Sequence, residues 1–171
     1  MPGPKWKFLP ITEKMELQSF DCGVPELNDY LKRYAGQNHR KGIGSTFVLV
    51  PFVGDQVALG YHTLSMAQVD LRFLPESQRK NLPKYPIPAV RLARLAVERH
   101  WQGKGLGELL LMDAIRRAVT AVQTVAGRYM IVDAQNKKAG EFYLRYGFHP
   151  FEGSSHSLVA AIDTLKELFI Q

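Results

Sequence analysis

Hydrophobic and polar residues recur along this chain with the two periods that distinguish helices from strands. Apolar residues at helical spacing predict amphipathic helices, and the two clearest are Glu26–Ala35 and Gly105–Val125. Further helices are expected at Leu74–Asn81, Lys137–Tyr146 and Asp163–Phe169. Runs rich in β-branched and aromatic residues predict strands at Lys7–Ile11, Ser45–Phe52, Gln56–Met66, Ala89–Val97 and Tyr129–Ala134. Strands mixed with helices in this order predict a mixed α/β sheet with flanking helices.

The turns between these elements indicate how the strands pair. The dipeptide Gly54-Asp55 separates the strands Ser45–Phe52 and Gln56–Met66, which predicts an antiparallel hairpin. The strand Ala89–Val97 is followed by a glycine-rich turn, the long helix and the strand Tyr129–Ala134, which predicts a right-handed βαβ unit. No linker-like stretch divides the 171 residues, so a single domain is expected over residues 1–171.

The composition is that of an ordinary globular protein, with 46% hydrophobic and 22% charged residues. The one cysteine, Cys22, rules out an internal disulfide and favours a reducing, intracellular setting. No apolar run is long enough to span a bilayer, and the first residues lack the apolar stretch of a signal peptide. His39, His62 and His100 show no metal-ligand spacing with Cys22. A cytoplasmic protein with neither a membrane segment nor a metal is therefore expected.

The formal net charge of +6 leaves two interpretations open. Such a balance is typical of proteins that bind a polyanion, whether nucleic acid, a membrane surface or an acidic protein. It is equally common in basic domains that have no such partner. Lys32 and Arg33, with Arg40 and Lys41 nearby, either form the solvated face of the first helix or a patch that tracks a nucleic-acid backbone.

A glycine-rich turn joins the strand Ala89–Val97 to the long helix. Glycines permit a backbone whose successive N–H groups converge on an anion, and the helix N-terminus adds unpaired donors and the positive end of its dipole. A lysine adds a charge, so the turn suits a phosphate group. Its residues are Gln102, Gly103, Lys104, Gly105, Leu106 and Gly107. Glu108 stands where the dinucleotide-binding pattern needs its third glycine, and the Gly-Lys-Ser/Thr of a P-loop is missing.

The spacing Q-x-x-G-x-G of this turn resembles the pyrophosphate-binding signature of the GNAT superfamily of acyltransferases. Phe142–Phe148 is similar to the family's F-Y-x-x-x-G-F segment, with Asn136 upstream of it. The resemblance implies the GNAT fold, with acetyl-CoA as a co-substrate bound by Gln102–Gly107 and Asn136. It also implies that backbone groups of Leu95, Ala96 and Val97 bind the pantetheine where this strand splays from its neighbour. Tyr143 then takes the place of the family's general acid.

A more specific resemblance covers nearly the whole chain. Its segments are Phe20-Asp21-Cys22, Leu27-Asn28, Tyr61–Leu64, Leu82–Pro88 and Leu92–Val97. Together they are similar to the TacT/AtaT-like toxins of toxin–antitoxin systems. This resemblance implies acetylation of the amino group of aminoacyl-tRNA, which blocks translation. It also implies a homodimer and a separate ribbon-helix-helix antitoxin.

The expected reaction is attack of an amine on a thioester, without a covalent enzyme intermediate. Full proton transfer from an ordinary tyrosine, with a pKa of ~10, to a thiolate whose thiol has a pKa of ~8.5 is uphill by ~2 kcal/mol. A hydrogen bond that strengthens as the thiolate forms still assists the reaction. No carboxylate stands out as a general base. An α-amino group, with a pKa of ~8, loses its proton more readily than a lysine side chain at ~10.4, which favours an α-amine substrate.

Two arginines interrupt the apolar strand Ala89–Val97. Arg91 and Arg94 either lie at a sheet edge or pair with a carboxylate, or they contact RNA or substrate beside the site. Together with Lys32 and Arg33, they are the candidate substrate-binding residues.

Two other functions remain open on the sequence alone. One is a GNAT enzyme that acetylates a small amine or a protein N-terminus, which transfer to a polyamine but not to charged tRNA would indicate. The other is a non-catalytic RNA- or partner-binding module on a GNAT scaffold, which a failure to bind acetyl-CoA would indicate. The intact turn Gln102–Gly107 and Tyr143 favour an enzyme.

Overall fold

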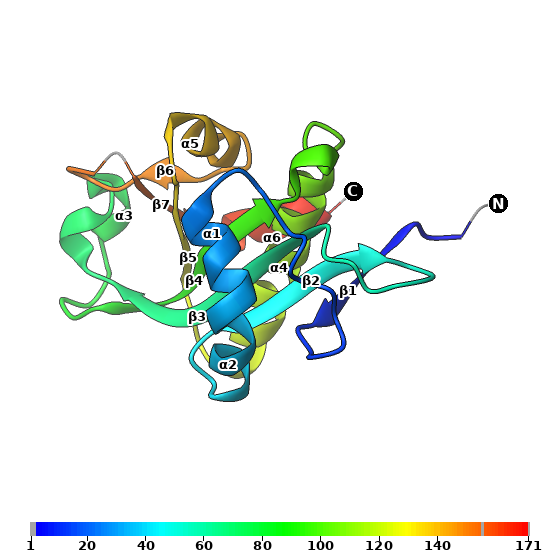
Figure 1. The fold of residues 1–171 in the computed structure, drawn as a ribbon. Coiled ribbons are helices and arrows are strands. Elements are labelled where there is room, and N and C mark those ends of the chain that lie inside the picture. Colours follow the sequence, from blue (N-terminus) through cyan, green and yellow to red (C-terminus); the bar gives the residue numbers. More distant parts are fainter. Residues whose placement is uncertain (1–2, 155, 171) are drawn as a thin grey trace. The chain divides into compact units, whose positions relative to one another are not determined.

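The computed structural model describes residues 3–154 and 156–170 (Figure 1). Within these ranges, seven strands follow one another in a mixed sheet in the order β1-β2-β3-β4-β5-β7-β6. The mixed α/β class predicted from the sequence is confirmed. The chain forms two compact units, the first made of the residues up to Ser65 with Arg94–Ala114, the second of Met66–Ala93 with the residues from Ile115 onward.

The first unit is built on antiparallel strands. β1 (Trp6–Pro10) pairs with β2 (Ser45–Pro51), and β2 pairs with β3 (Gly60–Val69). The predicted hairpin is confirmed, but its second strand begins later than Gln56. The reason is that the backbone before Gly60 bonds elsewhere: the carbonyl of Gln56 accepts from the N–H of Glu16 at 2.9 Å.

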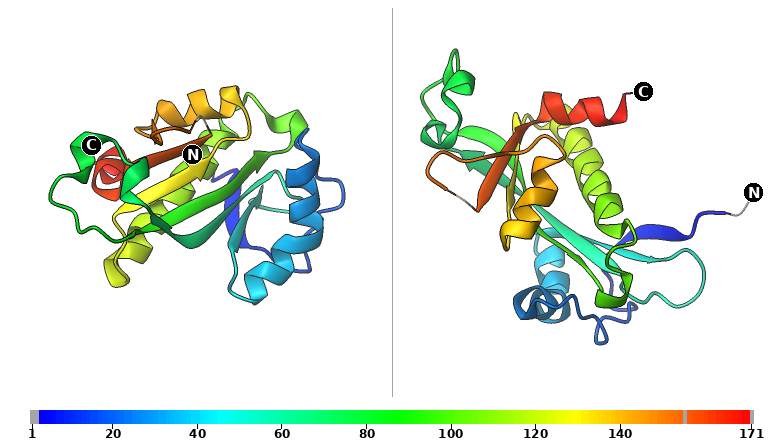
Figure 2. Two further views of the ribbon diagram at one scale, coloured as in Figure 1. Left: turned by 90° about the vertical axis from the view of Figure 1, so that its left-hand side faces the viewer. Right: turned by 90° about the horizontal axis from the view of Figure 1, so that it is seen from above.

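An apolar stripe holds the first helical segment. α1 (Pro25–Asp29) continues through a π-helical turn (Tyr30–Tyr34) into α2 (Ala35–Arg40), and Figure 2 shows the three as one continuous helix. The buried residues of the stripe are Leu27, Tyr30, Leu31 and Ala35. The predicted end of the helix at Ala35 is therefore wrong. The polar residues that follow lie on α2, because a surface helix needs apolar residues on one side only.

The second unit contains the paired strands of the βαβ connection. β4 (Ile87–Val97) runs parallel to β5 (Tyr129–Asp133), from the pair Ala89–Tyr129 to the pair Leu92–Val132. α4 (Leu106–Thr124) connects the two strands in the chain, as the sequence predicts. β5 also pairs antiparallel with β7 (Ser157–Ala161), which in turn pairs with β6 (His149–Pro150).

The remaining helices lie at the predicted positions with shorter bounds. They are α3 (Glu76–Arg79), α5 (Lys137–Leu144) and α6 (Ile162–Lys166). Short 3₁₀ turns form at Leu71–Phe73, Arg99–Trp101 and Glu167–Phe169. Gly147 follows α5 with a φ of 99°, the left-handed conformation in which helices often stop.

Each unit has its own apolar core. In the first unit, one cluster surrounds Phe20, Leu31 and Tyr61, and another joins Leu49 and Leu59 to Leu106 and Leu110 of α4. In the second unit, the clustered residues are Val69, Leu74, Ile87, Ala89, Tyr129, Ile131 and Val159. Because Leu106 and Leu110 are buried, the start of α4 and the turn before it are anchored to the strands of the first unit.

Candidate functional site

The glycine-rich turn has the backbone that the sequence predicts. Gly103 and Gly105 have φ values of 76° and 86°, in the left-handed region that L side chains rarely adopt. A Cβ at either position would meet nothing within 4 Å, so these glycines serve backbone conformation and not close packing. The first amides of a helix have no partner within the helix. Leu109 N–H donates to Gly105 O at 3.2 Å, so the helical hydrogen bonds of α4 begin only after its first residues. The turn therefore presents donors and a positive dipole end to solvent.

Positive charge accompanies these donors. The ammonium of Lys104 lies 4.9 Å from the centroid of the Trp101 ring, and Lys104 is exposed. Trp101 packs edge-on against Trp6, with ring centroids 5.3 Å apart. A cation beside converging amides is the arrangement that binds phosphate groups.

Gln102 has a different environment from the rest of the turn. Its side-chain nitrogen Nε2 donates to the carbonyl oxygens of Cys22 and Val97, both at 2.9 Å. The amide of Gln102 is thus engaged within the protein. Its contribution to an anion site comes through the shape of the turn.

The strand end Leu95–Val97 leads directly into this turn. Ala96 is buried, and Leu95 and Val97 pack partly buried against the cluster that holds Leu110. The β4–β5 ladder stops at Leu92, so the strand continues to Val97 beyond its parallel partner. The predicted contact of Leu95–Val97 with the pantetheine stays a prediction.

Tyr143 lies near the end of α5 in the second unit. Asn136 caps this helix, because its side-chain oxygen accepts from Ala139 N–H at 2.9 Å. Tyr143 is 6% exposed, and its ring packs edge-on against Phe142 and Phe148. Burial, with a smaller effect of the Asp133 charge, raises the pKa of Tyr143 above its ordinary value. The phenol therefore keeps its proton at neutral pH and is a hydrogen-bond donor.

The two strand arginines differ in their partners. Arg91 forms an ion pair with Asp133, whose other oxygen accepts from the Ser157 hydroxyl at 2.9 Å. The interpretation of Arg91 as the partner of a carboxylate is confirmed. Arg94 instead lies over the ring of Tyr30, and among residues 3–154 and 156–170 it has no ion-pair partner.

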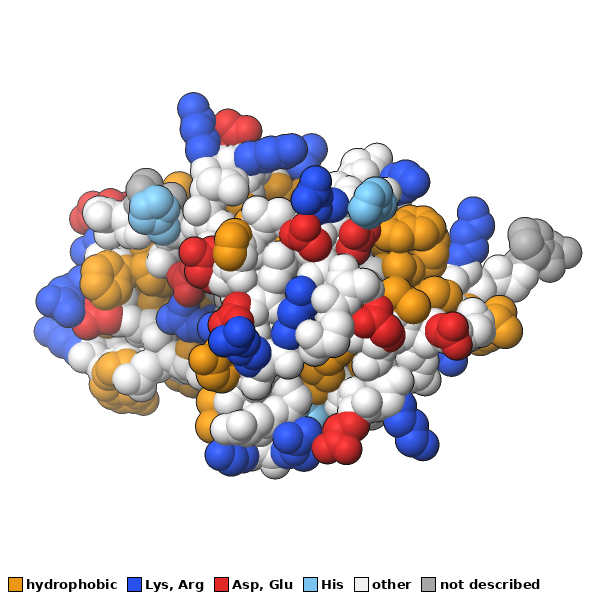
Figure 3. Space-filling model, in the orientation of Figure 1, with side chains coloured by type: hydrophobic (Ala, Val, Ile, Leu, Met, Phe, Trp, Pro, Cys, Tyr) orange, Lys and Arg blue, Asp and Glu red, His pale blue; other side chains and the backbone are white. Residues whose placement is uncertain are grey.

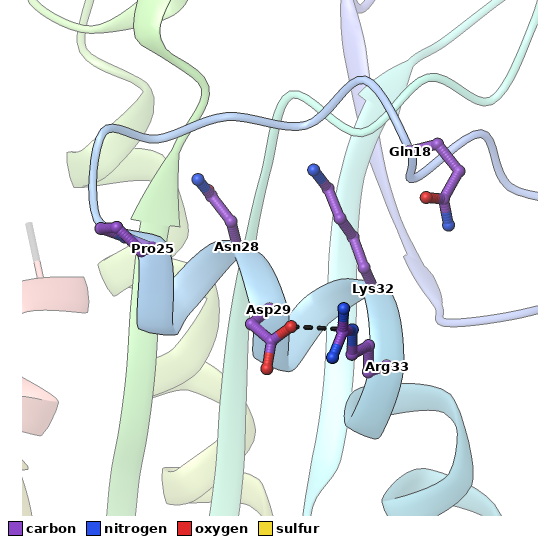
Figure 4. A pocket seen from close by; sticks show the side chains of 6 residues that line it. All are labelled: Gln18, Pro25, Asn28, Asp29, Lys32 and Arg33. Atoms are coloured by element: carbon purple, nitrogen blue, oxygen red, sulfur yellow. Dashed lines mark ion pairs between the residues drawn. The ribbon is translucent and has the colours of Figure 1, made fainter.

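Lys32 and Arg33 line an open pocket of about 510 Å³ beside α1 (Figure 4). The other lining residues are Gln18, Pro25, Asn28 and Asp29. Lys32 points toward the segment that carries Gln18, whereas Arg33 pairs with Asp29 at 2.9 Å. On the face drawn in Figure 3, Lys and Arg side chains stand among Asp and Glu side chains and form no continuous basic area. On this face, the net positive charge is not gathered into a basic patch.

Two groups that resemble catalytic residues are enclosed. His62 is fully buried, and its Nε2 lies 2.7 Å from Asp113 Oδ2, with the rings of Phe8 and Phe47 nearby. Cys22 is buried, its thiol donates to Val24 O at 3.6 Å, and burial raises its pKa. A buried thiol with a raised pKa is a poor nucleophile. Within the described ranges, no cluster of His, Cys, Asp or Glu suits a metal ion, and no helix is long and apolar enough to cross a membrane.

Comparison with known proteins identifies the family. Residues 77–157 match the model of an acetyltransferase (GNAT) domain. A tRNA-acetylating toxin of Mycobacterium tuberculosis is 37% identical over 138 residues, which cover 81% of this chain and 81% of the toxin. The chain belongs to the GNAT family of acetyltransferases.

Solved structures place this GNAT protein close to toxins of the same kind. AtaT complexed with acetyl-methionyl-tRNAfMet is 32% identical, with a TM-score of 0.89 over 96% of this chain and 99% of that chain. A tyrosine-to-phenylalanine mutant of AtaT, bound to acetyl-CoA and the C-terminus of the antitoxin AtaR, is 29% identical. Its TM-score is 0.83 over 98% of this chain and 100% of that chain.

The predicted site residues of this acetyltransferase fall into both units. The first unit brings together Lys32, Arg33, Arg94, Leu95–Val97 and Gln102–Gly107, and the second holds Arg91, Asn136 and Tyr143. No sequence pattern points to Arg99, which pairs with Asp21 at 3.0 Å beside the turn. The sequence places Tyr30 at an apolar position of a helix and within the resemblance to the toxins, but its contact with Arg94 depends on the fold.

Proposed function

We propose that this protein is a toxin that transfers the acetyl group of acetyl-CoA to the amino group of an aminoacyl-tRNA and thereby blocks translation. The observation that carries the proposal is the likeness, at 32% identity over nearly the whole chain, to a structure of AtaT with acetyl-methionyl-tRNA. The turn geometry and the buried Tyr143 support the same reaction.

The residues around the turn fit acetyl-CoA. The left-handed Gly103 and Gly105 give the backbone a concave run of donors, and Lys104 adds a charge for the phosphates. We assign the pyrophosphate to Gln102–Gly107, the pantetheine to backbone groups of Leu95, Ala96 and Val97, and a further contact to Asn136. Within this site, the proposed role of Gln102 is to hold the turn in place through its bonds to Cys22 O and Val97 O.

Tyr143 is the proposed general acid. Acetyl-CoA supplies the acetyl group as a thioester, and the neutral amine bonds to the acetyl carbon as the carbon–sulfur bond breaks. The nitrogen releases one proton to water, and coenzyme A leaves as a thiolate that is stabilised by a hydrogen bond and then protonated. Tyr143 holds a proton at its phenolic oxygen for the leaving sulfur. Because burial raises the pKa of Tyr143, the phenol assists chiefly as a hydrogen-bond donor to the developing thiolate and not as a strong acid. Backbone N–H groups of Leu95–Val97 are the proposed donors to the carbonyl oxygen.

The amine needs no dedicated base in this proposal. The buried pair of His62 and Asp113 is enclosed by apolar rings and is not offered to a large substrate. An α-amino group with a pKa of ~8 is neutral in a useful fraction near pH 7, and an ester-linked one more so. This chemistry supports aminoacyl-tRNA over a lysine side chain as the substrate.

Arg94 is the proposed contact to the RNA, with Lys32 and Arg33 as further candidates. A half-buried guanidinium without a carboxylate partner retains its full attraction for a phosphate. Arg91 is assigned a supporting role, because Asp133 already neutralises it.

We further propose that residues 1–171 form one GNAT domain, that the protein is a cytoplasmic homodimer, and that a ribbon-helix-helix antitoxin neutralises it. The similarity to AtaT bound to the C-terminus of AtaR supports an antitoxin partner. The cytoplasmic location is supported by the proposed substrate, because aminoacyl-tRNA is found there.

The test is an incubation of the purified protein with radiolabelled acetyl-CoA and total charged tRNA. Deacylated tRNA and a panel of polyamines serve as parallel acceptors. We expect label on charged tRNA alone. Label on polyamines alone would keep the acetyltransferase and discard the toxin, and absence of acetyl-CoA binding would favour a non-catalytic module.

A further inference from the structure

A group of hydrogen bonds ties the Asp21-Cys22 segment to the glycine-rich turn. Gln102 Nε2 donates to both Cys22 O and Val97 O at 2.9 Å. An amide nitrogen has two N–H groups, so this side chain spends its full donor capacity on bridging two segments. The strand end, the turn and the distant residue Cys22 are joined at this point.

A second set of hydrogen bonds joins Arg99 to Asp21, the residue that precedes Cys22. The N–H of Arg99 donates to Asp21 O at 2.8 Å, and its guanidinium donates to Asp21 Oδ2 at 3.0 Å. The Asp21 carboxylate also accepts from Gly23 N–H at 2.9 Å. These bonds, with the Gly23 N–H first, lower the pKa of Asp21 to about 2, so the carboxylate stays charged at all physiological pH values.

The same segment is bonded to the first helix. Asn28, on α1, accepts from Cys22 N–H at 2.8 Å and donates to Asp21 Oδ1 at 3.0 Å. An unbroken series of bonds therefore runs from the turn to α1. We call the six residues Asp21, Cys22, Asn28, Val97, Arg99 and Gln102 the clasp.

We propose that the clasp couples acetyl-CoA binding to the order of α1–α2, and that Gln102 is a positioning residue that shapes the turn without touching the cofactor. The inference rests on the proposed function, since it takes the turn as the acetyl-CoA site and α1–α2 as the carrier of Lys32 and Arg33. Cofactor binding then prepares the face that meets the RNA.

The turn needs such a brace for a physical reason. Two left-handed glycines in close succession leave the backbone many alternative conformations when nothing holds it. If only a fraction of the molecules has the turn in its binding conformation, the apparent dissociation constant equals the intrinsic one divided by that fraction. A hydrogen bond of ordinary strength corresponds to roughly a fivefold change in an equilibrium, so losing both bonds from Gln102 is expected to weaken binding roughly 25-fold.

The experiment uses the full chain and acetyl-CoA alone. Gln102→Met keeps the length of the side chain and removes both donors, whereas Gln102→Arg keeps two N–H donors. Gln123→Met, at an exposed position of α4, is the matched control. Acetyl-CoA affinity is measured by calorimetry, and amide hydrogen exchange is followed over Pro25–Arg40 with and without acetyl-CoA.

Acetyl-CoA is expected to slow exchange over Pro25–Arg40 in the unaltered protein. In Gln102→Met we expect roughly 25-fold weaker binding and, at saturating acetyl-CoA, no such slowing. Gln102→Arg should restore at least part of both effects, and Gln123→Met should change neither. The proposed coupling is overturned if Gln102→Met binds acetyl-CoA within twofold of the affinity of the unaltered protein. It is also overturned if acetyl-CoA still slows amide exchange over Pro25–Arg40 in this variant. If the protein binds acetyl-CoA but does not acetylate charged tRNA, the proposed function is overturned. The affinity and hydrogen-exchange measurements then still test the coupling, because neither depends on the acetyl acceptor.

Discussion

The guanidinium of Arg94 lies over the ring of Tyr30, with its carbon Cζ 3.5 Å from the centroid of the ring. Tyr30 is stacked on the buried Tyr61, at 6.5 Å between centroids, and the Tyr61 hydroxyl donates to Leu27 O at 2.7 Å. The cation–π contact holds the guanidinium, and within the described part of the chain no carboxylate pairs with it. Arg94 is therefore held ready for an anionic group.

Removing Arg94 should weaken the reaction with charged tRNA specifically. We expect Arg94→Ala to lower kcat/KM for charged tRNA about tenfold and to reduce the slope of log affinity against log salt by about one. Arg116→Ala is the matched control, because Arg116 also lies over an aromatic ring, 5.0 Å from Phe169. Steady-state assays at several salt concentrations measure both. An unchanged salt slope in Arg94→Ala would remove Arg94 from the RNA contact.

Tyr143→Phe should separate catalysis from stability. Loss of the phenolic donor is expected to lower kcat about 10²- to 10⁴-fold while acetyl-CoA affinity stays within about twofold. Tyr61→Phe is the counterpart, since Tyr61 is equally buried and its hydroxyl bonds to Leu27 O. It should cost about 1–2 kcal/mol of unfolding free energy and leave kcat nearly intact. The role assigned to Tyr143 fails if its variant turns over at the normal rate.

Gly105→Ala should damage the turn through its backbone. The φ of 86° at Gly105 places an alanine in a left-handed conformation that costs about 1–2 kcal/mol, and relief of that strain would reshape the donors. We expect roughly tenfold weaker acetyl-CoA binding by calorimetry. Gly54→Ala, with a φ of 94° in an exposed loop, carries the same strain and should leave affinity unchanged. Equal affinity loss in both variants would point to general destabilisation.

Gly60→Ala should show how tightly β3 approaches the strand end. A Cβ at Gly60 would lie 2.9 Å from Ala96 O and 2.8 Å from Leu110 Cδ1, both inside contact distance. The required shift is expected to cost about 1–3 kcal/mol in denaturant unfolding. In contrast, Gly36→Ala on α2 meets only the flexible end of Arg40 and should stabilise by up to about 1 kcal/mol. A neutral Gly60→Ala would mean that the strand end yields easily.

The hydrogen bonds to the Asp21 carboxylate, first that from Gly23 N–H and then those from Asn28 and Arg99, should make stability depend on pH in the acid range. The folded pKa of about 2 lies below the ordinary value of ~3.9, so the stabilisation is fully present above about pH 4 and is lost as the pH falls toward 2. Asp21→Asn removes this contribution. The gap in melting temperature between the unaltered protein and Asp21→Asn should therefore narrow between pH 4 and pH 2. A gap that is constant over this range would show that Asp21 is not held as a charged acceptor.

The sequence predicts the strands and the turn well because each depends on local chemistry. Ser45–Phe52 is rich in β-branched and aromatic residues, and Gly103 and Gly105 adopt the left-handed backbone that glycine tolerates best. The sequence does not predict the continuation of the helix from Ala35 to Arg40, because residues 36–40 contain no apolar side chain that would show a helical period.

Side-chain pairing is what the sequence does not reveal. Gln102 and Cys22 are 80 residues apart, and only the fold brings the carbonyl of one to the amide of the other. The same holds for Arg91, which pairs with Asp133 across two parallel strands. A resemblance could name these residues but could not say which of them contacts a ligand and which braces the site.

The proposed acetylation of aminoacyl-tRNA is tested most directly by determining the chemical form of the aminoacyl group after the reaction. Charged tRNA is incubated with the protein and acetyl-CoA and digested with nuclease, and the released aminoacyl-adenosine is weighed by mass spectrometry. We expect one acetyl group on the α-amine, its absence with Tyr143→Phe, and no acetylation of deacylated tRNA. An unmodified aminoacyl-adenosine from every charged tRNA, with a protein that binds acetyl-CoA, would contradict the proposed acetylation.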